Sequence, residues 1–291
     1  MTGLPRARLL ARAIATLGIL AGGLQCSRQS DDEARRQAWE QQVAASKARV
    51  AVVVRPGDPP RQVIAPPLAV GQDLVADISL VSTVTVHGTG GPTVTRTTNV
   101  TAQLHVHARP PARDVSPITF EITDLTGNLP DIDKLPRTGT IQPGAHGEPW
   151  VLVLDRPAQG EAGLLWSKDV AGWVRRVLMP IPPEPLGPGA AWRRTWDDYL
   201  GYDKVTEIDD YELVAIQNGV AQIKVSATSS ASSAAANGQS KATGIISLPV
   251  GARAVPTAEW SDQGSATITE KGQVTELKTT GTIRIKPHAS P

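Results

Sequence analysis

The sequence predicts a mainly β protein in which long antiparallel strands form a curled sheet or half-barrel, with one amphipathic helix packed on it. Two observations carry this prediction. Long segments of alternating apolar and polar residues occupy both halves of the chain, and the single segment between them repeats with a helical period. Strands and helices do not alternate along the chain, which favours an antiparallel sheet over a parallel one.

Composition narrows the class of protein. The chain has 291 residues, of which 40% are apolar and 20% charged, as is ordinary for a globular protein. The net charge is +1 and no basic stripe stands out, so we expect no nucleic-acid partner. The single cysteine excludes an internal disulfide framework.

Residues 1–26 predict a signal peptide. Arg6, Arg8 and Arg12 precede an uncharged run, Ala13 to Leu24, that is too short to span a bilayer as a permanent helix. Cys26 follows this run directly and resembles the lipidated cysteine of bacterial lipoproteins, although Gln25 stands where such signals place a small residue. We therefore expect export to the periplasm or outer membrane of a bacterium and an N-terminal lipid anchor in the membrane; a plain secretory signal is the alternative.

Residues 27–67 predict a spacer. A charged, Ala- and Gln-rich segment at 31–50 has the period of a short helix, and 50–67 is rich in proline. Repeated proline removes backbone donors and favours a semi-extended linker.

Residues 68–287 predict a single β-rich domain made of two β halves, 68–155 and 186–287, joined by a helix. Asn218-Gly219 marks a tight hairpin between two apolar runs. Proline- or serine-rich stretches at 129–147 and 228–240 are expected as loops. Whether the halves form one sheet or two stays open. The expected strands are 72–86, 93–107, 118–122, 150–154, 204–216, 220–227, 242–250, 258–270 and 273–286.

The helix predicted at 161–179 has one apolar stripe, with Arg175 and Arg176 on the opposite side. Three roles are open: packing against the sheet, a movable cover over an apolar cavity, or contact with a membrane surface. The cover hypothesis makes the stripe and two tryptophans of the following strand candidate ligand-binding residues: Trp166, Val170, Trp173, Val177, Trp192 and Trp196.

The segments GPGAAWRRT, YELVAIQNGVAQIKV and the GQV turn resemble an uncharacterised family of bacterial secreted and lipoprotein-like β proteins. This resemblance covers about residues 68–286 and implies no catalytic residues. Long antiparallel strands with a covering helix behind a lipoprotein signal are also similar, in architecture only, to the half-barrels of the lipoprotein carriers LolA and LolB.

Motifs for catalysis are missing from the sequence. It contains no Gly-rich phosphate loop and no GxSxG, and neighbouring acids such as Asp209 and Asp210 point to opposite faces of a strand, where we expect them to be solvated. His105 and His107 share a water-facing strand face, but a zinc site needs three or four ligands. We expect no enzyme, metal or cofactor, while a hydrolase stays open if folding brings acids together.

These observations leave two main hypotheses. The first is a non-enzymatic cell-envelope protein or lipoprotein whose β domain binds a protein partner or has a structural role. The alternative is a carrier or binder of a lipid or other apolar ligand in a curled-sheet cavity, which the many strands and the tryptophan-bearing helix favour.

Overall fold

The computed structural model describes residues 51–68, 71–88, 91–109, 118–143, 149–156, 160–200, 203–232, 236–270 and 273–289. The expected signal peptide (1–26) with Cys26 and the expected helix at 31–50 lie outside the described residues.

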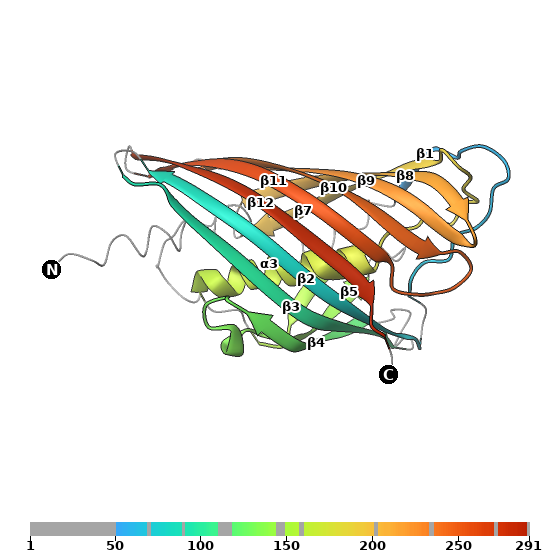
Figure 1. The fold of residues 1–291 in the computed structure, drawn as a ribbon, viewed down its shortest axis with the longest axis horizontal. Coiled ribbons are helices and arrows are strands. Elements are labelled where there is room, and N and C mark those ends of the chain that lie inside the picture. The colour runs from blue at the N-terminus through green and yellow to red at the C-terminus, as the bar shows by residue number, and fades with distance from the viewer. Residues whose placement is uncertain are drawn as a thin grey trace.

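The described strands form one curled antiparallel sheet, in the order β1-β7-β8-β9-β10-β11-β12-β2-β3-β4-β5-β6 (Figure 1). Most neighbours are consecutive in the chain. The pairing of β12 with β2 joins the two halves, so they form one sheet. The bounds are β1 Val52–Arg55, β2 Asp73–Gly88, β3 Val94–Ala108, β4 Ile118–Gly127, β5 Thr138–Pro143, β6 Pro149–Leu154, β7 Ala191–Leu200, β8 Asp203–Gln217, β9 Val220–Ser232, β10 Ala236–Pro249, β11 Thr257–Glu270 and β12 Gln273–Pro287.

Local patterns predicted most of these strands. The β8–β9 hairpin turns at Asn218 and Gly219, whose φ angles are +51° and +73°, as a type I′ turn requires. Helix α3 (Gly160–Val177) matches the predicted helix and is followed by a proline-rich segment. The mainly β fold with one packed helix is therefore confirmed.

One expected loop is mostly strand, and another contains a short strand. Most of 228–240 belongs to β9 and β10, which pair along their length and share a hydrogen bond of 2.7 Å between the Ser229 and Ser240 hydroxyls. The interval 129–147 contains β5 and the short 3-10 helix Ile132–Lys134. Pairing to neighbours on both sides overrides the weak strand propensity of Ser, Ala and Gly.

The proline-rich interval 51–67, expected as a linker, packs on the domain. Its valine run forms β1, which pairs with β7 at one edge of the sheet, and Gln62 bridges to Leu186. Ile64 is only 1% exposed. Proline is tolerated at a sheet edge, where a missing N–H donor breaks no ladder, so the prolines did not exclude a folded segment.

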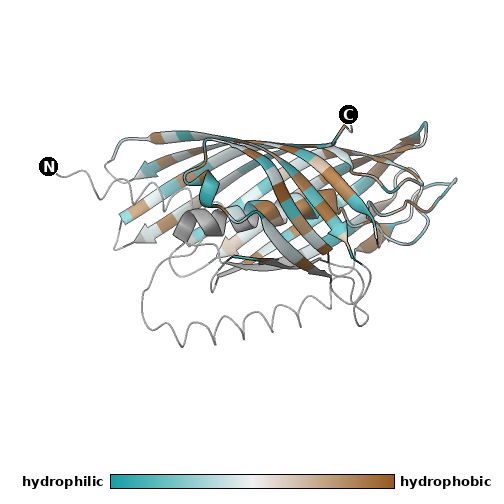
Figure 2. Ribbon diagram, turned by 90° about the horizontal axis from the view of Figure 1, so that it is seen from below, coloured by the Kyte–Doolittle hydropathy of each residue, from teal (hydrophilic) through white to brown (hydrophobic). Residues whose placement is uncertain are grey.

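The sheet curls around α3, and the apolar core lies between them (Figure 1). Hydropathy alternates along many strands (Figure 2), so each strand has an inner, core-facing side and an outer side. Threonines on the outer side bond across strands, as in Thr83–Thr97 (3.1 Å) and Thr85–Thr95 (3.2 Å). No helix among the described residues is long and apolar enough to cross a membrane.

Candidate functional site

The predicted ligand-binding residues lie in the packed core. Five of them are buried to 0 or 1% exposure and belong to one apolar cluster: Trp166, Val170, Trp173, Val177 and Trp192. Trp196 is in β7, but its side chain lies outside the described residues. These exposures fit the first of the three roles of α3, in which its stripe packs against the sheet.

Trp166 and Trp192 are fixed by both ring contacts and hydrogen bonds. Trp166 meets Trp173 edge to face, with 5.3 Å between ring centroids and 88° between ring planes, and Trp192 stacks on Tyr211 at 5.3 Å and 7°. The Trp166 indole N–H donates to the Pro136 carbonyl at 2.6 Å, and that of Trp192 donates to the Pro180 carbonyl at 3.0 Å.

One register row divides the inner face of the sheet. We call it the charged row, because it contains Arg194 on β7, Asp209 on β8 and Asp262 on β11, with alanines between them. Its members, in order from β7 to β3, are Arg194, Asp209, Ala227, Ala242, Asp262, Gly281, Ser82 and Thr98.

The two sides of the charged row differ in character. The adjoining row toward the core is mostly apolar: Trp192, Tyr211, Val225, Gly244, Trp260, Ile283, Leu80 and Val100. On the other side, the inner positions of β9 to β11 are small, and we call them the small-residue strip: Ser229, Ala231, Gly238, Ser240, Gly264 and Ala266. The inner face thus passes from apolar to charged to small within a few rows.

The β7–β8 end of the charged row is buried. Arg194 is 2% and Asp209 5% exposed, and the Tyr211 hydroxyl donates to the Asp209 carboxylate at 3.3 Å. Burial raises the pKa of Tyr211 well above its ordinary value, and the negative charge of Asp209 adds to this rise. The expectation that Asp209 is solvated is therefore wrong. Its neighbour Asp210 does face outward, where it pairs with Arg193 at 2.7 Å.

At the β11 end, a cation from α3 meets the sheet. The Arg176 guanidinium lies 5.0 Å from the centroid of the Trp260 ring. Gly172, one helical turn earlier, leaves room for it, since a Cβ there would lie 2.8 Å from an Arg176 nitrogen. Periodicity placed Arg176 on the side of α3 opposite the core, but its long side chain reaches the sheet.

Asp262 shares this environment. Burial raises the pKa of its carboxyl, and the positive charge of Arg176 partly offsets that rise. The carboxylate lies over Gly281 of β12, where a Cβ would collide with it. Glycines therefore make room for both members of this charged pair.

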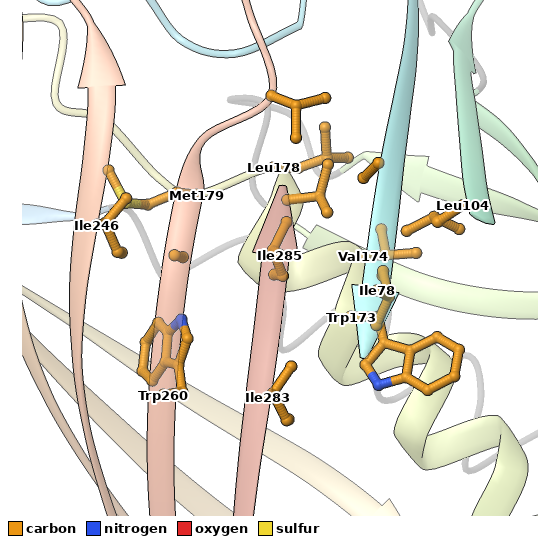
Figure 3. Packing of buried hydrophobic residues seen from close by; sticks show 14 of the residues in the cluster. Ile78, Leu104, Trp173, Val174, Leu178, Met179, Ile246, Trp260, Ile283 and Ile285 are labelled. Carbon is orange, nitrogen blue, oxygen red and sulfur yellow. The ribbon is translucent and has the colours of Figure 1, made fainter. Parts of the chain in front are cut away.

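Helix α3 and strand β11 also carry buried donors. Trp173 Nε1, Arg176 Nε and Trp260 Nε1 are buried and have no hydrogen-bond partner in the part of the chain that the structure describes. In Figure 3 the two indole rings lie on either side of Ile283 and Ile285, and each indole nitrogen is on the side turned toward these isoleucines.

The described residues offer little that would support catalysis. No group of three or more His, Cys, Asp or Glu side chains among them is placed to hold a metal ion. His105 contacts the Thr123 hydroxyl at 3.0 Å, and His107 pairs with Asp73. Asp209 and Asp262 are three strand spacings apart, about 14 Å along the sheet, so they form no converging pair.

Sequence reasoning missed four residues of the site. Trp260 and Asp262 lie in a predicted strand. Because they are two and four residues after Ala258, they share its face of the strand, which is the inner face. Arg194 and Tyr211 are likewise inner-facing by alternation from Trp192 and Leu213. Alternation alone could have found all four, but not that their rows align across the sheet.

Comparisons with known proteins identify no family. No protein-family model and no curated protein matches the chain. Among solved structures, an outer membrane channel from Pseudomonas putida F1 is 9% identical with a TM-score of 0.20, over 79% of this chain and 99% of that one. Pseudomonas aeruginosa OccK2 (OpdF) is 8% identical with a TM-score of 0.18, over 74% and 97%. Such low scores carry no argument about fold or function.

Proposed function

We propose that this protein is a non-enzymatic binding protein of the bacterial cell envelope, which holds a lipid or other apolar ligand on the inner face of its curled sheet. The observation that carries the proposal is the gradient of that face, from apolar rows under α3, through the charged row, to the small-residue strip.

An amphipathic molecule matches this gradient. Its hydrocarbon part would lie against the apolar row, where Trp260 and Ile283 stand side by side, and gain free energy by leaving water. Its polar part would lie near the charged row, where Asp262 and Arg194 supply opposite charges. Beyond that row, the inner side chains of β9 to β11 are no larger than serine and would leave room for a bulky polar head group of the ligand.

The envelope location is part of the same proposal. It rests on the sequence of residues 1–26, whose basic start and apolar run are typical of an exported protein, and on Cys26 as the expected lipid anchor. A carrier tethered to a membrane in this way would be placed beside a source of amphipathic molecules.

Native mass spectrometry of the full-length protein, purified gently from its own host, tests the proposal. We expect a co-purifying mass of lipid size that is lost on denaturation. A protein that shows only its own mass, and that takes up no lipid when mixed with an extract of the host's membranes, would contradict ligand binding.

A second candidate is a partner-binding or structural domain, which one observation favours. The edge strand β1 carries Val52 and Val54 at 63% and 68% exposure. An exposed apolar edge strand is a template for the addition of a strand from another chain. The same mass spectra test it: a bound protein mass, lost in Val54→Lys, would support this candidate, and its persistence in that variant would contradict it.

A further inference from the structure

Strand β7 is paired unequally on its two sides. Toward the interior of the sheet, β8 pairs with it along its whole length. Toward the edge of the sheet, β1 pairs only with Ala191 to Arg193. Among the described residues, no second strand lies beside Thr195 to Leu200. Each of these residues carries a backbone donor and acceptor, so six residues of sheet edge can take a further strand.

The chain itself arrives at this edge in the direction that such a strand needs. Strand β1 is antiparallel to β7, with Val53 opposite Trp192 and Val52 opposite Arg193. Ala51 and Val53 both pack against the main apolar core, as residues two apart on one extended strand do. The chain therefore still follows β7 at Ala51, and the residues that precede it lead toward Thr195 to Leu200.

The register of β1 on β7 predicts the pairs that would follow. Continued without a shift, it puts Val50 opposite Thr195 and Lys47 opposite Asp198. Both members of the first pair are β-branched, and the second pair combines opposite charges. Cross-strand pairs of these two kinds stabilise antiparallel sheets.

Arg49 adds a second complementary charge. It would lie opposite Trp196 and, by alternation from Ala51, on the inner face of the sheet. Glu207 of β8 is opposite Trp196 and also opposite Ser229 of the small-residue strip, so it belongs to the same face. Two strand spacings, about 10 Å, would separate the backbones of Arg49 and Glu207, which their two long side chains can bridge.

We propose that residues 45–50 form a strap that continues β1 and pairs with Thr195 to Leu200. Residues 45–50 lie outside the described residues, and the helix expected at 31–50 would end before them. The strap covers an edge that is otherwise a template for pairing between molecules, so it keeps the protein from associating through β7. It forms whether or not the inner face binds a ligand.

Disulfide trapping in the full-length protein tests the register. Val50→Cys with Thr195→Cys puts two thiols on opposite residues, whose Cα atoms are about 4.5–5.5 Å apart in an antiparallel pair, a distance that a disulfide spans. Val50→Cys with Asp197→Cys is the matched control, because its second thiol is shifted by about 7 Å along β7. Both carry Cys26→Ser, which removes the only native cysteine. After mild oxidation, peptide mass spectrometry should find at least about tenfold more intramolecular disulfide in the first variant, which corresponds to about 1.4 kcal/mol.

Hydrogen exchange followed by mass spectrometry needs no substitution in β7, so it keeps the test valid if the cysteine variants fold poorly. The amides of 46–50 should exchange at least about tenfold more slowly than in an unfolded peptide. Lys47→Glu with Arg49→Glu should remove this protection, because it turns attraction into repulsion. Arg35→Glu with Arg36→Glu is the matched control: it changes the net charge equally but lies outside the strap, so protection should remain.

Three results would overturn the strap. Equal disulfide yields in the two cysteine variants, or none in either, would exclude the predicted register. A disulfide that joins two molecules would show that the strand at this edge comes from a second copy. Protection of 46–50 that survives the charge reversal would indicate a helix, which does not depend on the acids of β7 and β8.

Discussion

The four buried tryptophans whose indole nitrogens are described fall into two pairs. Trp166 and Trp192 donate to the carbonyls of Pro136 and Pro180. Trp173 and Trp260 donate to nothing in the described part of the chain. All four are at most 4% exposed, so the difference concerns the partners of their N–H groups and not their burial.

The difference follows from what each pair packs against. Pro136 and Pro180 lie in irregular segments, where a backbone carbonyl is not used by a helix or a ladder. Trp173 lies on α3 and Trp260 on β11, and both elements use their carbonyls for their own hydrogen bonds. Where regular elements pack against each other, spare backbone acceptors are therefore scarce, whereas the irregular segments at Pro136 and Pro180 supply them.

The largest expected effect tests whether the apolar stripe of α3 is packed against the sheet at all. Trp173→Ala should lower the free energy of unfolding by about 3–5 kcal/mol, because it removes a fully buried ring and leaves a cavity. Chemical denaturation followed by circular dichroism measures this. A loss below about 1 kcal/mol would show that α3 is a loosely held cover, and the comparison between the two pairs would lose its basis.

The next effect concerns the packing of the Trp260 ring against Gly244. A Cβ on Gly244 of β10 would lie 2.8 Å from the Glu259 carbonyl oxygen and 3.0 Å from the Trp260 ring. Gly244→Ala should therefore cost about 1–3 kcal/mol by overpacking. Gly238→Ala is on the same face of β10 but in the small-residue strip. Its Cβ would lie 3.3 Å from the Ala266 Cβ and 3.6 Å from the Ser265 carbonyl oxygen, so this change should cost clearly less. Equal losses would mean that Trp260 is not held tightly on Gly244.

A direct comparison of the pairs uses tryptophan-to-phenylalanine variants. Trp166→Phe and Trp192→Phe each remove a formed hydrogen bond and leave a proline carbonyl without its donor, whereas Trp173→Phe and Trp260→Phe remove a donor that has no described acceptor. We expect the first two to be less stable than the second two by about 1–2 kcal/mol, measured by thermal unfolding of ligand-free protein. If all four lose the same stability, the second pair is hydrogen-bonded in solution.

The sequence predicted the parts of this comparison that depend on local periodicity. Strand alternation and the stripe of α3 placed Trp166, Trp173 and Trp192 on core-facing sides, and Asn218-Gly219 marked a hairpin. The end of β9 after residue 227 and the start of β10 before residue 242 escaped prediction, because Ser, Ala and Gly carry little strand propensity of their own.

The site itself depends on long-range alignment that no local pattern reports. The acceptor of Trp166 is 30 residues away in the chain. The charged row exists only because β7, β8 and β11 come into register across four pairings. Arg176 follows its helical period at the backbone, yet its side chain reaches Trp260 because Gly172 leaves a path. The length of the Arg176 side chain and the absence of a side chain at Gly172 allow the contact with Trp260, and a local sequence pattern reports neither effect.

The smallest expected effect concerns the charge of Asp262, which lies two residues from Trp260 on β11. Burial raises the folded-state pKa of Asp262 above its unfolded value, so the folded state binds more protons than the unfolded state between those two pKa values. The free energy of unfolding contributed by Asp262 therefore falls as pH rises through that window and stays lower above it. Asp262→Asn, an isosteric neutral side chain, should be slightly more stable than the wild type at neutral pH and lose this advantage on acidification. Denaturation curves of both proteins between about pH 4 and 8 give the difference directly. A difference that does not vary with pH would show that the positive charge of Arg176 stabilises the carboxylate as well as water does.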